Sequence, residues 1–538
     1  MTEKRKSFVA GAALLAGAGL IGKVIGAFYR VWMSALIGVE SGMVIFSLPY
    51  SVYSFLLVIS SAGLPTAISR MVSTRIATGD RAGAREVARS ARRMLFVTGL
   101  LATVFMFVFA RPLAAMTGDE AAAPAFMALA PSVFIVCMIS SYRGYFQGMQ
   151  KMTPTALSQL VEQIGKLVIG FPLAAWLMPR GFVWGAVGAI AGVTLSELAA
   201  LALMLGANMG QRMRDRDIER PAQREKGILR SLLAIAIPIT IGASMMPIVG
   251  LVDSYLVINR LQSAGLSIEA ARAMYGPLTN IAKSIVDMPA VITLAMSTSL
   301  VPAISSALAR KEEDGARSIA TTGLKLAALI GMPAAVGMSI LAGPIVQFLY
   351  GSQSAEAKAL GAQLLTVMAV GVFFLSLIQT SAGIFQGLGK PAIPVATLGV
   401  GIVVKIILNY VLVATPGIYV MGAAYATLTC YAIAATLNVA IIAKLTRAKG
   451  KRLLELLRPA VAAIGMGAAL LGVRAVLQTR VGNTTYLAIG VLMGVAVYGG
   501  LLVLTRALSE EDMRFLPGGG RLKRLFAGKG AKRDGGVR

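Results

Sequence analysis

The sequence predicts an all-α polytopic membrane protein, and three observations support that fold class. Of the 538 residues, 57% are hydrophobic and only 14% are charged, whereas about a quarter of the residues in a soluble domain are charged. Apolar runs of about 20 residues, the length that a helix needs to cross a bilayer, follow one another along most of the chain. The alternating segments of about ten residues that a transmembrane β-barrel requires are absent from the sequence.

The chain is strongly basic, with 51 Lys and Arg against 24 Asp and Glu. Such an excess can indicate a nucleic-acid partner, but that function requires a basic soluble domain with base-reading or stacking residues. The sequence contains no such domain, and its basic residues gather in alternate short loops between the apolar runs. This is the positive-inside pattern of membrane proteins, so we expect contact with membrane lipids and none with nucleic acid.

Histidine is absent, and the two cysteines, Cys137 and Cys430, both lie within apolar runs. A histidine proton relay, a histidine metal site and a catalytic histidine are therefore excluded. Two isolated cysteines form neither a disulfide framework nor a metal motif. We expect no catalytic residue, no bound metal and no cofactor.

The apolar runs predict fourteen membrane spans. The first follows the basic sequence M-T-E-K-R-K, and no small-residue cleavage site and soluble domain come after it, so we interpret it as an uncleaved span. In chain order the expected spans are residues 8–36, 43–68, 92–113, 124–147, 155–178, 183–207, 229–257, 274–302, 318–341, 358–386, 392–414, 419–444, 456–477 and 485–506.

The loops between these spans divide into basic and weakly charged ones. Clusters of Lys and Arg follow the second, sixth, eighth and twelfth spans, whereas intervening loops such as 38–42, 118–123 and 351–357 are short and carry few cations. Basic loops stay in the cytoplasm. Both termini are therefore expected there, and the number of spans is even.

An internal repeat relates the two halves of the chain. The sequence F-Q-G occurs at 146–148 and at 385–387, and Lys166 is related to Lys405 by the same offset of 239 residues. A repeat of six helices in each half predicts two lobes related by an axis near the membrane normal. The expected division is a first lobe at 1–207, a basic cytoplasmic linker at 208–228, a second lobe at 229–446, two further helices at 447–507, and a basic cytoplasmic tail at 508–538.

Two cations, Lys23 and Arg30, lie within the first apolar run. They are seven residues apart, which is nearly two helical turns, so both fall on one helix face. A cation at membrane depth costs several kcal/mol unless it faces protein, water or an opposite charge. We expect this face to line a wet cavity that attracts a polyanion such as a pyrophosphate; the alternative, for Arg30, is a side chain that snorkels to the headgroups.

Three more lysines within spans, Lys166, Lys283 and Lys405, are further candidates for the cavity. Lys166 and Lys283 each have a carboxylate at the spacing of an ion pair within one helix, so a purely structural pair is the alternative for both. Arg143 lies near the cytoplasmic end of the fourth span, and we interpret it as a rim residue.

Four carboxylates within spans, Glu162, Glu197, Asp253 and Asp287, are candidates for binding an ion that drives transport. Without histidine, a carboxylate is the ordinary side chain left for that role. Glu162 is four residues from Lys166, and Asp287 is four residues from Lys283, so structural ion pairs remain the alternative there. Asp253 has no such partner within its span, and it needs a lysine, a proton or a sodium ion.

Four sequences near the start of the chain resemble one family. G-K-V-I-G-A-F-Y-R at 22–30, L-I-G-V-E-S-G at 36–42, L-P-Y-S-V-Y at 48–53 and G-L-P-T-A-I-S-R-M-V at 63–72 resemble the polysaccharide biosynthesis/stage V sporulation protein B family. That family belongs to the multidrug/oligosaccharidyl-lipid/polysaccharide (MOP) exporter superfamily. The resemblance implies the MOP fold of two six-helix lobes, alternating access, and two extra helices that add a groove for a lipid tail.

The related MurJ-type flippases carry S-R-x-x-G-x-x-R in the first span, where the cations engage the pyrophosphate of the substrate. In this chain Lys23 stands for the first Arg of that pattern, and one extra residue precedes Arg30. Those flippases also carry Arg and Glu in the second span, where this chain reads V-I-S-S-A-G-L at 58–64. The resemblance therefore transfers a role to Lys23 more directly than to Arg30.

The resemblance implies flipping of an undecaprenyl-linked saccharide, lipid II or a related cell-wall precursor, across the bacterial cytoplasmic membrane by a monomer without enzymatic activity. The energy would come from a Na⁺ or H⁺ gradient or from the membrane potential, since no G-x-x-x-x-G-K-[ST] motif is present. Two alternatives remain: a drug/cation antiporter of the same superfamily, which would need an acidic, aromatic cavity, and a sporulation membrane protein that transports nothing.

Overall fold

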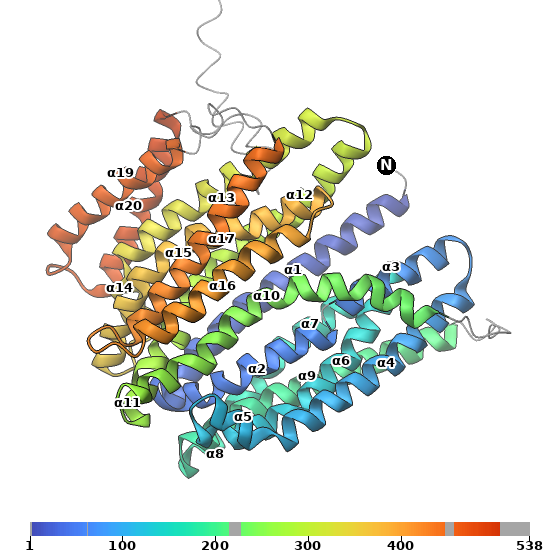
Figure 1. Ribbon diagram of the computed structural model, residues 1–538, viewed down its shortest axis with the longest axis horizontal. Coiled ribbons are helices and arrows are strands. Elements are labelled where there is room, and N and C mark those ends of the chain that lie inside the picture. The colour runs from blue at the N-terminus through green and yellow to red at the C-terminus, as the bar shows by residue number, and fades with distance from the viewer. Residues whose placement is uncertain (1–2, 62, 215–226, 447–456, 506–538) are drawn as a thin grey trace, which may run out of the picture. The chain divides into compact units, whose positions relative to one another are not determined.

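The computed structural model describes residues 3–61, 63–214, 227–446 and 457–505, and those residues form helices joined by short turns, without a strand (Figure 1). The helices are α1 (Glu3–Ile37), η1 (Gly38–Gly42), α2 (Met43–Ser61), α3 (Gly63–Ala77), α4 (Arg81–Val108), α5 (Ala110–Met116), η2 (Glu120–Ala122), α6 (Ala123–Gly148), α7 (Thr153–Gly165), η3 (Lys166–Gly170), α8 (Phe171–Leu177), η4 (Met178–Arg180), α9 (Phe182–Arg214), α10 (Ile228–Ser263), α11 (Ile268–Gly276), η5 (Pro277–Ala282), α12 (Lys283–Ala309), α13 (Glu313–Ile340), α14 (Ala342–Leu349), α15 (Ala355–Gly387), α16 (Ala392–Leu412), α17 (Val420–Thr446), α19 (Leu457–Leu477) and α20 (Asn483–Leu504).

Among the described residues, 13 helical stretches are long and apolar enough to cross a membrane. The first of them, Gly17–Ala77, is 61 residues long and contains most of α1 together with η1, α2 and α3. Since two of the predicted spans fall within this one stretch, the observed helices agree with the prediction of about fourteen. The all-α membrane fold class is confirmed.

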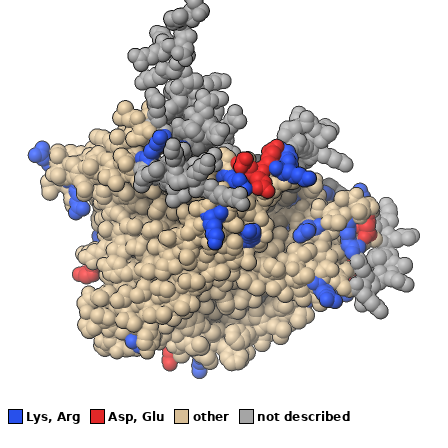
Figure 2. Space-filling model, turned by 45° about the horizontal axis from the view of Figure 1, so that its top comes forward, with Lys and Arg blue, Asp and Glu red and all other residues tan. Residues whose placement is uncertain are grey.

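The outer surface of the helices is apolar, as a lipid-facing surface must be. Figure 2 shows one face of the molecule, where a broad area without charged side chains lies beside a margin at which Lys and Arg gather. Leu101, Val108 and Trp176 are examples of large apolar side chains that are about two-thirds exposed, at 65%, 64% and 67%.

The chain forms two compact units. The first unit contains residues Met1–Ile285, Leu349–Leu364 and Leu398–Cys430. Within it α2, α4, α6, α7 and α9 pack side by side (Figure 1). All the site residues predicted from the sequence belong to this unit, except Asp287, which belongs to the second unit.

The second unit contains residues Val286–Phe348, Leu365–Thr397 and Tyr431–Arg538. One of its apolar cores joins α13 to the predicted thirteenth and fourteenth spans, α19 and α20. The Tyr498 hydroxyl of α20 donates to the Leu329 carbonyl of α13 at 2.8 Å, which satisfies the one polar atom that this ring brings into the core. The predicted lobes and their linker stay a prediction; residues 215–226 of the linker and the tail at 508–538 lie outside the described residues.

Small residues set the distance between α7 and α9 in the first unit. A Cβ atom at Gly165 would lie 2.8 Å from the Cβ of Ser196, and a Cβ atom at Gly192 would overlap the backbone of Gly170. Small residues at such contacts let helix backbones approach closely inside a membrane. This approach brings the residue after Ser196, Glu197, next to the η3 turn that begins at Lys166.

Three segments of the described chain have the wider π-helical turn: η1, η3 and η5. Turns of this kind interrupt the regular ladder of backbone hydrogen bonds and often occur at functional sites. Lys166 is the first residue of η3, and Lys283 directly follows η5. Two of the predicted cavity lysines therefore lie where the helix geometry changes.

Candidate functional site

The first polar cluster consists of Tyr53, Arg143, Glu162, Lys166 and Glu197, from α2, α6, α7, η3 and α9. Glu162 is central: its Oε1 lies 3.2 Å from Lys166 Nζ and its Oε2 lies 3.2 Å from an Arg143 guanidinium nitrogen. Arg143 Nε also donates to the Ser158 hydroxyl at 2.9 Å. The three charged side chains are only 10–16% exposed, so this is an ion network inside the helix bundle.

Glu197 belongs to the same cluster but has no cation in hydrogen-bonding contact among the described residues. The Tyr53 hydroxyl donates to its Oε1 at 2.8 Å. Its other oxygen, Oε2, is buried and has no hydrogen-bond partner in the part of the chain that the structure describes. The residue as a whole is 1% exposed.

The second polar cluster consists of Asp253 of α10 with Lys405 and Asn409 of α16. Lys405 Nζ lies 2.7 Å from Asp253 Oδ2 and also donates to the Val249 carbonyl at 2.9 Å. Asn409 Nδ2 donates to Asp253 Oδ1 at 3.0 Å. Lys405 is fully buried, and each oxygen of Asp253 has a donor, so the cluster is a compact, neutral ion pair.

The two cations of the first span differ in their surroundings. Arg30 is half-buried and donates to the Ser284 hydroxyl of α12 at 3.1 Å, which places the end of α1 against the start of α12. The neighbouring Lys283 is also half-buried, and its ammonium group lies beside Gly250 of α10. A Cβ atom added to this glycine would be 3.0 Å from Lys283 Nζ. Lys23 is exposed on α1.

The helix ends that the sequence predicts to face away from the cytoplasm are joined by polar contacts. Arg272 of α11 makes a bidentate ion pair with Asp119, with nitrogen–oxygen distances of 2.6 and 2.7 Å. The side-chain amides of Asn259 and Gln262 donate to the carbonyls of Met116 and Gly118 at 2.8 and 2.7 Å. These contacts link the turn after α5 to α10 and α11.

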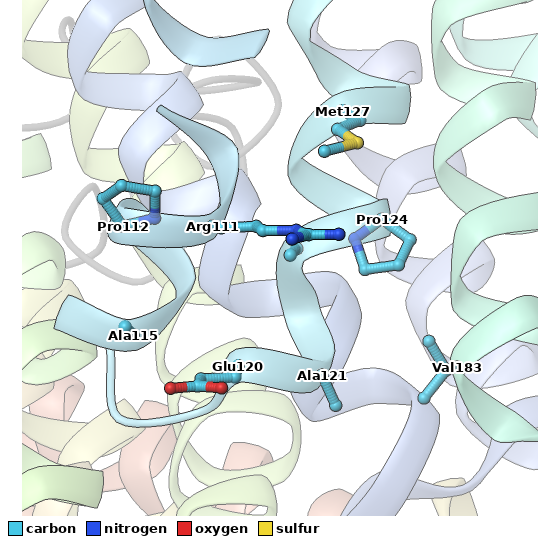
Figure 3. Close-up of a pocket in the computed structure, with 9 residues that line it drawn as sticks. Arg111, Pro112, Ala115, Glu120, Ala121, Pro124, Met127 and Val183 are labelled. Atoms are coloured by element: carbon cyan, nitrogen blue, oxygen red, sulfur yellow. The ribbon is translucent and has the colours of Figure 1, made fainter. Parts of the chain in front are cut away.

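A pocket of about 770 Å³ lies beside the same turn and is shown in Figure 3. Its charged lining residues are Arg111, which extends between Pro112 and Pro124, and Glu120. None of the site residues predicted from the sequence lines this pocket. It is therefore separate from the two polar clusters.

The structure contains one pair that the sequence predicted and other contacts that the sequence did not indicate. The ion pair of Glu162 with Lys166 follows from their spacing and is observed. Arg143, interpreted as a rim residue, is instead a largely buried partner of Glu162, and that interpretation was wrong. Asp253 pairs with Lys405, which is 152 positions away in the sequence. Asp287 is exposed on α12.

The described residues contain no group of three or more His, Cys, Asp or Glu that could hold a metal ion. Cys137 and Cys430 are both buried free thiols. The buried cations of the first unit can hold an anion, and its buried carboxyls can hold a proton or a small cation.

Comparison with known proteins agrees with the resemblance seen in the sequence. The profile of the family described as "Lipid II flippase MurJ" matches residues 33–492. Stage V sporulation protein B of Bacillus subtilis (strain 168) is 26% identical over 524 residues, covering 96% of this chain and 99% of that protein. The lipid II flippase MurJ of the same organism is 26% identical over 413 residues, covering 73% and 75%.

Two solved structures share the fold. The structure described as "Lipid II flippase MurJ, inward closed conformation" superposes with a TM-score of 0.68 at 15% identity, over 92% of this chain and 99% of that one. An inward-facing multidrug resistance MATE family transporter of the MOP superfamily superposes with a TM-score of 0.65 at 18% identity, over 80% and 96%. The predicted MOP fold is confirmed.

Proposed function

The chain belongs to the lipid II flippase MurJ family, and from that premise we propose that it flips an undecaprenyl-pyrophosphate-linked saccharide, lipid II or a related cell-wall precursor, across the bacterial cytoplasmic membrane. The observation that carries the proposal is the set of buried or half-buried cations in the first unit. Arg30, Arg143, Lys166 and Lys283 all lie within membrane-spanning stretches. Their positive charge suits the pyrophosphate of such a lipid, and it disfavours a cationic drug.

The cations provide the two kinds of contact that a pyrophosphate uses. An arginine guanidinium offers paired donors to two phosphate oxygens, and a lysine ammonium acts as a point charge. Arg30 contacts Ser284, the residue after Lys283, at the start of α12, whereas Arg143 and Lys166 meet at Glu162. The saccharide head moves past these groups while the polyprenyl tail stays in lipid, against the apolar outer surface of the helices.

Transport proceeds by alternating access and requires no covalent chemistry. The polar contacts around Asp119 and Arg272 suit a state that is closed at the outer side, from which a lipid at the cytoplasmic side would be loaded. Both termini lie in the cytoplasm, and the protein acts as a monomer. The membrane potential can contribute about 2.3 kcal/mol per charge per 100 mV, and an ion gradient can add to it.

The test is complementation of a bacterial strain depleted of its lipid II flippase. Wild type is expected to restore growth, and Arg30→Ala and Lys23→Ala are expected to fail at equal membrane abundance. Arg111→Ala is the matched control, because Arg111 also lies at the end of a span but lines the separate pocket. Failure of wild type at full abundance would contradict the cell-wall substrate, and rescue by all three variants would contradict the cationic site.

A further inference from the structure

The four carboxylates within the spans are not equivalent in the structure. Glu162 has two cations, and Asp253 has a lysine and an amide. Asp287 is exposed on α12. Glu197 differs from these three, since it is buried and one of its oxygens has no hydrogen-bond partner among the described residues.

The groups that face Glu197 come from each helix packed against that part of α9. Tyr53 of α2 donates to Oε1, while Glu162 of α7 and Lys166 of η3 are its charged neighbours. From α6, the Ser132 hydroxyl lies close to the carboxyl, and Arg143 points to Glu162. From α1, the hydroxyl of Tyr29 donates to the Ala189 carbonyl of α9.

An ionised Glu197 would be poorly compensated in this environment. Taking a carboxylate out of water costs several kcal/mol unless partners replace the hydration of its oxygens. One phenol donor satisfies Oε1, but no described donor lies within hydrogen-bonding distance of Oε2, and the nearby Ser132 hydroxyl is hydrogen-bonded to the Thr194 hydroxyl at 2.8 Å. The negative charge of Glu162 repels an ionised Glu197 more strongly than Lys166 attracts it. A proton on Oε2 removes the charge, so the carboxyl is no longer repelled by Glu162, and a neutral oxygen without a partner costs less than a charged one.

We propose that Glu197 is a proton-binding site and that its proton is linked to the binding of an anionic lipid headgroup at the first polar cluster. With Glu197 protonated, the positive charges of Arg143 and Lys166 exceed the single negative charge of Glu162, and the cluster is positive. With Glu197 ionised, the same four groups are neutral together. An anion therefore binds more tightly to the protonated form, and by reciprocity the bound anion holds the proton.

This linkage makes the proton the coupling ion of the proposed function. It rests on that function only for the identity of the anion. A pyrophosphate-linked lipid would load together with a proton on Glu197 and would be released when that proton leaves. Since Lys166 begins a π-helical turn, the ammonium sits where the helix can change its geometry when the charge of the cluster changes.

The proton site is tested first without any lipid, by infrared difference spectroscopy of the purified full-length protein during a pH titration. Wild type is expected to show the carbonyl band of a protonated carboxylic acid at neutral pH, and Glu197→Gln is expected to lose it. Asp253→Asn is the matched control, since Asp253 pairs with Lys405 in the separate second polar cluster and its replacement is expected to leave the band. A wild-type spectrum without the band, or a band that survives in Glu197→Gln, would overturn the proton site.

The linkage is tested by measuring the affinity for undecaprenyl diphosphate as a function of pH. The affinity of wild type is expected to fall as pH rises, by up to about tenfold per pH unit, which is the limit for linkage to one proton. Glu197→Gln, a permanent mimic of the neutral acid, is expected to bind tightly with a flat pH profile. An equal slope in both proteins would overturn the linkage.

The two measurements separate this proposal from the proposed function. If undecaprenyl diphosphate does not bind at any pH while the infrared band depends on Glu197, the substrate assignment fails and the proton site stands. If the lipid binds with the same pH profile in both proteins, the substrate assignment stands and the linkage fails. Tyr53→Phe gives a second readout, a shift of the band through loss of its hydrogen bond, in case Glu197→Gln does not fold.

Discussion

The internal repeat predicted from the sequence relates Lys166 to Lys405, yet the two polar clusters hold these lysines in different ways. Lys405 is fully buried in a neutral pair whose carboxylate, Asp253, is satisfied by one lysine and one amide. Lys166 shares Glu162 with Arg143, next to the buried carboxyl of Glu197. The first cluster can change its net charge by one proton, whereas the second is fixed by its own ion pair.

Lysines at matching positions of the predicted repeat can therefore have different roles. A neutral pair that is closed on itself stabilises the packing of α10 against α16 and leaves little charge for a ligand. A cluster with more cations than ionised carboxylates attracts an anion. The predictions that Lys405 binds substrate and that Asp253 binds a coupling ion are untested, and the geometry favours a structural role for both.

The largest loss of stability is expected when one member of the ion pair in the second polar cluster is removed. Asp253→Ala leaves the Lys405 ammonium buried without its carboxylate, which is expected to cost about 3–5 kcal/mol of stability. The measurement is unfolding of the purified protein in mixed micelles. The double variant Asp253→Leu with Lys405→Met removes both charges and is expected to recover most of the loss, since an apolar pair can replace a buried ion pair. A single variant as stable as wild type would contradict the account of this cluster.

A smaller loss of stability is expected at the equivalent lysine of the first cluster. In Lys166→Met the Glu162 carboxylate keeps Arg143, so the cost is about 1.5–3 kcal/mol, the range for one hydrogen bond to a charged group. Transport of lipid II is expected to be lost all the same, because the positive charge of the cluster is gone. Lys166→Arg is the control that keeps the charge, and transport that persists in Lys166→Met would refute the difference between the clusters.

A still smaller change is expected for Tyr53→Phe, which removes only the hydrogen bond from the Tyr53 hydroxyl to Glu197. The expected cost is about 1 kcal/mol, typical of a single hydrogen bond. Unfolding in mixed micelles measures it. A loss as large as that of Asp253→Ala would mean that Tyr53 supports an ionised carboxylate, contrary to the neutral acid proposed for Glu197.

The smallest loss of stability is expected for a residue outside the membrane-spanning stretches, Asp80. Its measurement provides a scale for the other three losses. Asp80 caps the N-terminus of α4 in the loop after α3, and its carboxylate accepts from the Gly83 backbone N–H at 2.7 Å and from Arg75 at 2.8 Å. These two donors, the backbone N–H first, hold the pKa of the Asp80 carboxyl below its ordinary value. Since the Asp80 side chain is 41% exposed, Asp80→Ala is expected to cost only about 0.5–1 kcal/mol, the low end for an N-cap.

The lowered pKa of Asp80 fixes the direction of its pH dependence. The stabilisation is fully present above the ordinary pKa of an aspartate and is lost as pH falls through the lowered value in the folded protein. The difference in stability between wild type and Asp80→Ala should therefore shrink at acidic pH. A difference that grows on acidification would show that the carboxylate is not the stabilising form.

The sequence was sufficient for features that depend on one segment at a time. Hydropathy locates the spans, and a spacing of four residues predicts the pair of Glu162 and Lys166, since both properties are local to one helix. The pairing of Asp253 with Lys405 depends on which helices are neighbours, and no local pattern contains that information. The burial of Arg143 was missed for the same reason: its partner Glu162 lies on another helix.

We propose that buried cations of the first polar cluster move a lipid-linked pyrophosphate, while the second polar cluster only holds the fold together. The most direct test is flipping of labelled lipid II in proteoliposomes by wild type, Lys166→Met, and the double variant Asp253→Leu with Lys405→Met. The expected result is that wild type and the double variant flip the lipid and that Lys166→Met does not. Wild type that leaves lipid II in one leaflet, or an active Lys166→Met beside an inactive but folded double variant, would contradict it.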